Sequence, residues 1–219
     1  RVSITPHAPY SMSRELMEKV KQEPNKFVTI HNQETEGENE LFQTKTGKMY
    51  EQLARFNDAI KEWEATGKNS LPSYLPFLAD GKKILLVHNT YTTKEDIVFT
   101  HQYIDQIYWC FCPNANEYIE EQQPDYSLFL NEKCTIGTDS LASNWSLSIL
   151  DELKSISKKN PTIPLQKLLQ WATYNGAEFL EFDELGSIEK GKTPGLNLIS
   201  EVNLDALKLA TNSSVKKLL

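Results

Sequence analysis

The sequence predicts an α/β fold built on a parallel sheet, and two observations support this. The apolar runs are short, rich in β-branched and aromatic residues, and separated by longer helical patterns. Four of the five runs end directly in His or Asp, and the fifth ends in a Pro-Asn turn. In a (β/α) barrel the carboxyl ends of the strands converge on one mouth. We therefore expect a barrel whose polar strand ends form one site.

The five expected strands are the apolar runs themselves. They cover residues 2–4, 27–30, 84–87, 107–111 and 134–136. Helical periodicity lies between and after them, and two of the helices begin at a Ser or Thr that can cap free backbone N–H groups. The expected helices are 14–21 after Ser13, 49–64, 94–102 after Thr93, 146–158 and 164–180.

The connection between residues 31 and 88 is longer than the others and carries six aromatic residues. We expect an insertion over about residues 37–82, with a turn region at 71–76, which acts as a lid that excludes water from the mouth. The alternative is that these aromatic residues only pack the helix of the insertion. They are Phe42, Tyr50, Phe56, Trp63, Tyr74 and Phe77.

Composition narrows the class of protein. The 219 residues are 39% hydrophobic, which suffices for a sizeable core, and the formal charge of −7 with a pI near 5.2 argues against nucleic acid and anionic membranes as main partners. No apolar run is long enough to span a membrane, and no signal peptide is apparent. Three cysteines leave at least one unpaired in any disulfide scheme, which suits a reducing compartment. We expect a cytoplasmic protein in which Cys110 and Cys112 are core residues.

His31 and Glu34 are the first candidates for chemistry. A histidine at a strand end can ligate a divalent metal, and a carboxylate three residues later can handle protons over the same pocket. His88 and Asp139 follow two further strands, so all four side chains are expected at one rim, where a metal could activate water. The alternatives are a buried structural role for His88 and a helix N-cap role for Asp139.

Several short motifs along the chain resemble, in the same order, those of the amidohydrolase superfamily. The resemblance covers nearly the whole chain and is closest to the branch of cytosine deaminases, chlorohydrolases and S-adenosylhomocysteine deaminases. The motifs are His7 in TPHAPYS, residues 31–34, His88-Asn89, CPNAN at 112–116, GTDSLASN at 137–144, ATYNGA at 172–177 and GSIEKGK at 186–192.

This resemblance implies a metal-dependent hydrolase on a TIM (β/α)8 barrel that acts on non-peptide carbon–nitrogen bonds with one zinc or iron. His31, His88 and Asp139 would be placed at the metal, and Asp139 would also deprotonate the attacking water. Glu34 would protonate a ring nitrogen and then transfer a proton to the departing ammonia, while His88 would polarise the hydrated carbon. The residues placed in or near the substrate pocket are His7, Ser143 and Asn144.

The departures from the family pattern concern the N-terminal side. The family draws two further metal ligands from a His-x-His pair on its first strand, and the chain has no such pair. The five strands would match the fourth to eighth of a barrel, so we expect residues 1–183 to be the C-terminal part of the barrel. Residues 184–219 would be part of a small β-sandwich, with a strand at 196–199 and a helical piece at 204–209. The expected partner is the N-terminal half of the same protein or a second copy.

The function predicted is removal of an amino group from a cyclic amidine or nucleobase-like small molecule by metal-activated water. Two alternatives stay open. One is hydrolysis of a cyclic amide or a carbon–halogen bond on the same barrel. The other is a non-catalytic binding or scaffold protein that lacks the metal.

Overall fold

The computed structural model describes residues 2–78 and 81–219. The residues that lie outside the described ranges are Arg1, at the start of the predicted barrel part, and Ala79 and Asp80 of the predicted insertion. The chain divides into two compact units, Arg1–Trp109 and Cys110–Leu219, and each is described by itself.

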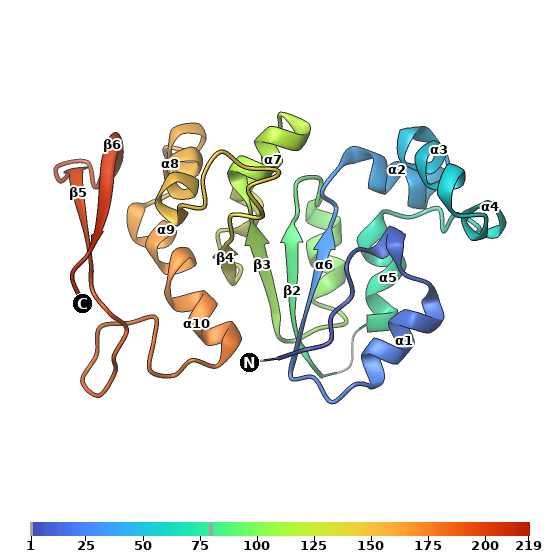
Figure 1. Cartoon of the computed structure of the whole chain (residues 1–219), viewed down its shortest axis with the longest axis horizontal. Helices are drawn as coiled ribbons and strands as arrows, with labels where there is room; N and C mark the ends of the chain where they lie inside the picture. The colour runs from blue at the N-terminus through green and yellow to red at the C-terminus, as the bar shows by residue number, and fades with distance from the viewer. Residues whose placement is uncertain (1, 79–80) are drawn as a thin grey trace. The chain divides into compact units, whose positions relative to one another are not determined.

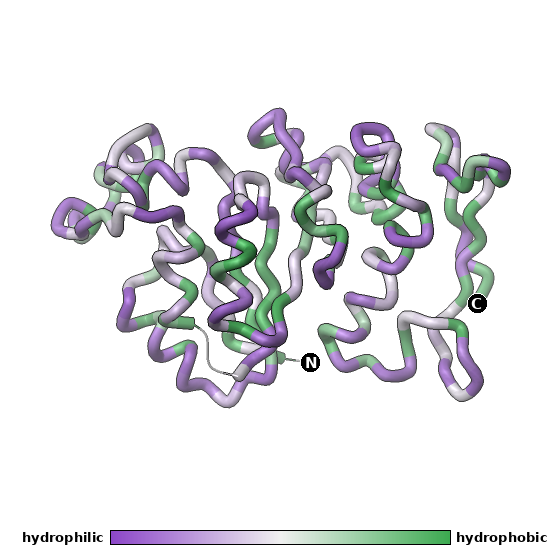
Figure 2. Tube along the Cα trace, turned by 180° about the vertical axis from the view of Figure 1, so that it is seen from behind, coloured by the Kyte–Doolittle hydropathy of each residue, from purple (hydrophilic) through white to green (hydrophobic). Residues whose placement is uncertain are grey.

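The first unit is organised around two parallel strands. β1 (Phe27–Asn32) pairs with β2 (Lys83–His88) from Phe27 opposite Lys83 to Asn32 opposite His88. Both strands alternate between buried and partly buried residues, and Figure 2 shows the apolar stretch along them. β3 (Ile107–Phe111) begins in this unit next to β2 and is buried throughout. The predicted α/β class with parallel strands is confirmed, and a closed barrel stays a prediction.

Helices surround these strands, and two of their starts were expected from caps. The N–H of Leu16 donates to Ser13 Oγ at the start of α1, and Thr93 forms a capping box with Asp96 at the start of α6. α1 and α2 both pack against α5 (Figure 1). The elements are η1 (Pro9–Ser11), α1 (Arg14–Gln22), α2 (Glu36–Thr44), α3 (Gly47–Phe56), α4 (Ala59–Glu62), α5 (Ser70–Leu78) and α6 (Lys94–Thr100).

The predicted strand at residues 2–4 is not formed. The segment runs beside β1, but side-chain oxygens take the place of backbone ladder groups. Ser3 Oγ donates to the Phe27 carbonyl at 2.5 Å, and the N–H of Thr29 donates to Thr5 Oγ1 at 2.8 Å. Regular pairing is therefore interrupted although the segment is held in place.

The insertion differs from expectation in two respects. The predicted helix at 49–64 is divided into α3 and α4, because Asn57 adopts an extended backbone and its Oδ1 accepts the N–H of Ala59 at 3.0 Å. The turn predicted at 71–76 is wrong, since these residues belong to α5. Pro72 lies in the first turn, where it is tolerated, and burial at helical spacing outweighs Pro76. The buried residues of this helix include Leu71, Tyr74, Leu75 and Leu78.

The second unit contains the end of β3, a short strand and a hairpin. β4 (Cys134–Ile136) lies beside β3, and the N–H of Gly137 donates to the Phe111 carbonyl at 2.9 Å. Phe111 is the centre of an aromatic core, with ring centroids of Tyr126 and Phe129 at 5.0 and 5.1 Å. The other elements are α7 (Pro113–Glu120), η2 (Tyr126–Phe129), α8 (Ile149–Lys159), α9 (Leu165–Ala172), α10 (Tyr174–Leu180), β5 (Asn197–Asn203) and β6 (Lys208–Lys217).

Two helical predictions in this unit need correction. The helix expected at 164–180 is interrupted at Thr173, which has a non-helical backbone, and becomes α9 and α10. The helical piece expected at 204–209 is a turn followed by β6, which pairs antiparallel with β5. The Asn203 side chain accepts the N–H of Ala206 at 2.9 Å and so builds the turn. The strand expected near 196–199 is present as β5.

Two sequence expectations concern the whole described chain. Within residues 2–78 and 81–219, none of the helices is both long enough and apolar enough to cross a lipid bilayer. All three cysteines are thiols, and Cys110 and Cys112 are buried as expected.

Candidate functional site

His31 and His88 share one edge of the first unit because β1 and β2 run parallel and both end there. Residues 31 and 88 lie at the carboxyl ends of the two paired strands. Their rings are stacked, with centroids 5.3 Å apart and planes inclined by 22°. The expectation that these two histidines meet at the same rim is therefore met in the structure.

The hydrogen bonds of His31 define which ring nitrogen is available. Its Nδ1 lies 2.6 Å from the carbonyl oxygen of His7, and its backbone N–H donates to the same oxygen at 3.0 Å. Because a carbonyl oxygen can only accept, Nδ1 carries the proton. In the neutral ring the lone pair is then on Nε2, as in histidines that ligate metals while a second partner fixes the tautomer.

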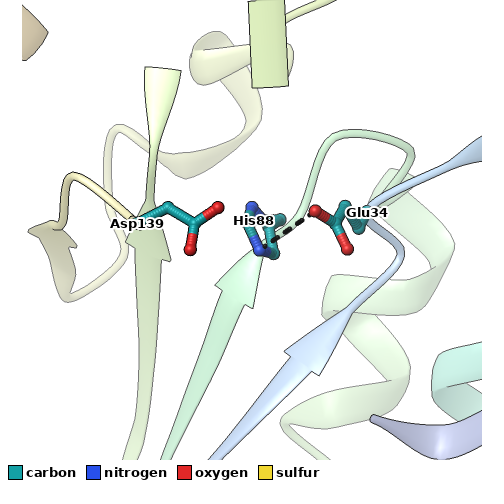
Figure 3. A group of neighbouring side chains, drawn as sticks. All are labelled: Glu34, His88 and Asp139. Atoms are coloured by element: carbon teal, nitrogen blue, oxygen red, sulfur yellow. Dashed lines mark ion pairs between the residues drawn. The ribbon is translucent and has the colours of Figure 1, made fainter. Parts of the chain in front are cut away.

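Glu34 and His88 form an acid–base pair. Glu34 Oε1 lies 3.4 Å from His88 Nε2, as Figure 3 shows. The His88 side chain is 1% exposed, whereas that of Glu34 is 17% exposed, so the carboxylate is the more accessible member. The pair therefore places a proton carrier beside a buried imidazole.

The turn that carries His88 has an unusual backbone. His88 and Asn89 have φ values of 80° and 60°, a region that non-glycine residues rarely adopt. Asn89 Nδ2 donates to the Leu86 carbonyl at 2.9 Å, which helps to hold this turn. Such strain costs on the order of 1–3 kcal/mol per residue and is concentrated at functional sites.

Glu38 is a buried carboxyl group that supports the loop bearing Glu34. Its Oε1 accepts the N–H of Gln33 at 3.0 Å, and its Oε2 accepts the N–H of Glu34 at 3.4 Å. Burial raises its pKa from 4.5 to about 7, and the nearby charge of Glu34 acts in the same direction. Sequence reasoning missed this residue, although the spacing of four from Glu34 within a predicted insertion was a visible signal.

A buried polar network fixes residues that adjoin Glu34 and His88 in the sequence. Asn32, directly after His31, accepts from Tyr74 Oη at 2.9 Å and donates to Asn89 Oδ1 at 3.0 Å. Gln33 Nε2 donates to Asp96 Oδ2 at 2.9 Å. Fully satisfied networks of this kind hold one geometry, because each member loses its partner if the others move. α5 and α6 thereby position the ends of β1 and β2.

His7 lies next to His31, on the chain segment that precedes η1. The two ring centroids are 4.9 Å apart, and His7 Nδ1 is 3.0 Å from Ser11 Oγ. Tyr10 packs edge-on against His7 with centroids 6.2 Å apart. Burial raises the pKa of Tyr10 to about 12, and the charges of Glu34 and Glu38 add to this. His7 is exposed and therefore able to contact a small molecule.

In the second unit, Asp139 follows β4 after two residues, as the sequence predicted for a strand end. Its φ of 57° is left-handed, and Ser143 Oγ donates to its Oδ2. Asn144 is buried, and its amide donates to the Thr138 carbonyl at 2.6 Å and to Glu152 Oε1 at 2.7 Å. Ser143 and Asn144 thus shape the Asp139 loop, and their contact with substrate stays a prediction.

Gly137 fits tightly beneath this loop. A Cβ at this position would lie 3.2 Å from Cys110 Sγ and 3.3 Å from Cys112 Sγ. We expect Gly137→Ala to lower the free energy of unfolding by about 1–3 kcal/mol, because a packed core must shift to admit a methyl group. Thermal unfolding measures the change.

Gly176 provides the matched control, since it lies in α10 and a Cβ there meets no atom of the described chain within 4 Å. Gly176→Ala should raise stability by roughly 0.5–1 kcal/mol through helix propensity. Equal effects of the two substitutions would contradict the steric account of Gly137.

The fold and the site together define a class. Two parallel strands end in stacked histidines, and a carboxylate contacts His88. This arrangement is typical of hydrolases that activate water at the mouth of an α/β barrel. Comparison with known proteins identifies the family: the model of the amidohydrolase family matches residues 1–218. The chain belongs to the amidohydrolase family.

Individual relatives agree with this. The chain is 27% identical over 201 residues to a 5-methylthioadenosine/S-adenosylhomocysteine deaminase of Bacillus cytotoxicus, covering 86% of the chain and 41% of the relative. It is 28% identical over 229 residues to a 5'-deoxyadenosine deaminase of Methanobrevibacter smithii, covering 98% and 48%. The aminofutalosine deaminase of Helicobacter pylori superposes with a TM-score of 0.74 at 25% identity, covering 89% and 50%. The chain spans less than half the length of these two curated relatives.

Proposed function

We propose that the protein is a metal-dependent aminohydrolase that converts the amino-bearing carbon of an adenine-type ring, within a nucleoside-like substrate, to a carbonyl and releases ammonia. The observation that carries this is the Glu34–His88 pair, 3.4 Å apart, with the His88 ring stacked on that of His31, in a member of the amidohydrolase family. The similar deaminases support a nucleoside-like substrate in preference to a free amide.

Each residue has a role in the proposed reaction. Water adds to the carbon that carries the amino group while Glu34 gives a proton to the adjacent ring nitrogen. Glu34 regains a proton from the water as it adds and passes this proton to the amino nitrogen. The carbon–nitrogen bond then breaks, ammonia leaves, and the new hydroxyl group returns its proton to Glu34 as it becomes the carbonyl. His88 donates a hydrogen bond to the oxygen that develops charge, for which its burial is suitable because hydrogen bonds are stronger away from water.

The residues present fit a divalent metal of the kind that this family uses. His31 offers Nε2, since its Nδ1 is bonded to the His7 carbonyl, and His88 offers a ring nitrogen at the end of the neighbouring strand. Zinc and iron both accept this donor set. Such an ion, when bound, lowers the pKa of a coordinated water to roughly 7 and so supplies hydroxide at neutral pH.

The test is ammonia release by the protein made from its complete reading frame and supplied with zinc or iron(II). Substrates are 5'-deoxyadenosine, 5'-methylthioadenosine, adenine and cytosine, and mass spectrometry identifies the product in which oxygen replaces the amino group. We expect ammonia from the two nucleosides and much less from the free bases. Lack of ammonia from every nucleoside, at full metal occupancy, would reject the proposed function.

A further inference from the structure

The first unit contains a cavity of about 410 Å³ between its N-terminal segment and the insertion. One wall comes from η1 and the start of α1, and the other comes from the insertion helices α2, α4 and α5. Its volume lies within the range of small-molecule pockets, about 300–1,000 Å³. Its aromatic lining residues are Tyr10, Phe42, Trp63, Tyr74 and Phe77.

Two lining residues connect this cavity with the candidate active site. Ser11 is 3.0 Å from His7 Nδ1, and the ring of His7 is in turn 4.9 Å from that of His31. Tyr74 lines the cavity and donates to Asn32 at the end of β1. A substrate whose reacting ring lies at His31 and Glu34 would therefore direct its remote end past His7 into the cavity.

The cavity is chemically suited to flat, apolar groups. Phe42 and Trp63 meet edge to face with centroids 5.3 Å apart, which is a favoured arrangement of aromatic rings. Four of the six aromatic residues predicted for the insertion line it: Phe42, Trp63, Tyr74 and Phe77. Phe56 is 88% exposed and lies elsewhere on the insertion.

Charged groups are scarce in the lining. Among its described residues only Arg14 and Glu15 carry a full charge, and both belong to the first turn of α1. Arg14 already pairs with Glu18 at 3.1 Å and lies over the Phe77 ring at 4.5 Å. A substituent with its own charge would lose water and compete for these partners, which disfavours it relative to an uncharged one.

We infer that the cavity is a subsite for an uncharged aryl substituent at the end of the nucleoside remote from the reacting ring. This inference rests on the proposed function and names the substrate class more closely. Aryl burial between Phe42, Trp63 and Phe77 supplies binding energy distant from the chemistry, and such energy can raise kcat/KM. The subsite thus sets specificity and takes no part in proton transfer.

The experiment compares four nucleosides on the protein made from its complete reading frame. They are 5'-deoxyadenosine, 5'-methylthioadenosine, 5'-deoxy-5'-(phenylthio)adenosine and S-adenosylhomocysteine. We expect kcat/KM for the phenylthio compound to exceed that for 5'-deoxyadenosine by about 10- to 100-fold, the range that burial of an apolar group gives. S-adenosylhomocysteine, which carries a charged amino acid, should fall below the phenylthio compound.

Substitutions in the cavity test whether its aromatic residues cause the preference for the phenylthio compound. Trp63→Ala should reduce the phenylthio preference to a few-fold, Trp63→Phe should retain most of it because a ring is kept, and Phe56→Ala on exposed α3 should leave the four constants unchanged. Circular dichroism confirms that each variant is folded. If Trp63→Ala is unfolded, Phe42→Leu is the substitute, with the same expected loss.

The outcomes separate this inference from the proposed function. Deamination of 5'-deoxyadenosine without preference for the phenylthio compound overturns the subsite alone. Lack of ammonia from all four compounds rejects the proposed function, and calorimetric titration then decides the subsite by itself. Tighter binding of the phenylthio compound than of 5'-deoxyadenosine, lost in Trp63→Ala, supports it, and equal binding overturns it.

Discussion

Replacing Glu34 with Gln is expected to lower kcat for deamination by about 10²–10⁴-fold while the metal content stays unchanged. The physical reason is that the amide has nearly the shape of the carboxylate but can neither donate a proton to the ring nitrogen nor pass one to ammonia. Glu34 is proposed as a proton carrier and not as a metal ligand, so its neutralisation should spare the ion. Steady-state ammonia release and elemental analysis measure the two quantities.

Glu36→Gln is the matched control for this substitution. Glu36 is exposed in the first turn of α2, two residues beyond Glu34, and the same chemical change there should leave kcat within about twofold. Turnover that persists in Glu34→Gln, or metal that is lost from it, would show that the role of the carboxylate has been assigned wrongly.

The second large effect concerns Glu38 and the pH dependence of stability. Its pKa is raised from 4.5 to about 7 in the folded protein, chiefly by burial. An acid with a raised pKa binds more protons in the folded than in the unfolded state between these two values. Its contribution to stability is therefore complete below pH 4.5 and is lost as the pH rises through about 7. We expect a loss on the order of 1–3 kcal/mol over this window.

Glu38→Gln should remove this slope, because the amide does not titrate. It should also weaken the bonds from the N–H groups of Gln33 and Glu34, since a neutral oxygen is a poorer acceptor than a carboxylate. Urea denaturation from pH 4.5 to 8 measures the slope, and hydrogen exchange at the two amides measures the local effect.

Glu51→Gln on exposed α3 is the control, and it should keep the pH dependence of the natural protein. An identical slope in Glu38→Gln and the natural protein would mean that another group is responsible. Unchanged exchange at Gln33 and Glu34 would mean that Glu38 does not hold the loop.

The sequence predicted the part of the site that depends on local pattern. A short apolar run followed directly by His31 or His88 identifies a strand and its end, and parallel strands bring such ends to one edge. The helix caps at Ser13 and Thr93 could also be predicted from the sequence, because each hydroxyl accepts a backbone N–H only three residues further along the chain. These features require no knowledge of distant contacts.

The insertion was harder to predict for a physical reason. Pro72 and Pro76 indicate a turn, yet residues 70–78 are helical because four large side chains on one face are buried by α1 and α2. Propensity is a weak preference that such burial overrides. The break of the predicted 49–64 helix at Asn57 shows the opposite case, in which a local side-chain bond ends a helix that periodicity alone would continue.

The sequence by itself determined the α/β class, the strand ends that carry His31 and His88, and the family whose motifs the chain shares. Only the tertiary structure decided that Glu38 is a buried support for Glu34, that Nδ1 of His31 is bonded to the His7 carbonyl, and that the aromatic residues of the insertion surround a cavity. Local patterns encode where strands and helices begin and end. The burial of a carboxyl group and the tautomer of an imidazole depend on neighbours brought from elsewhere in the chain, which periodicity does not specify.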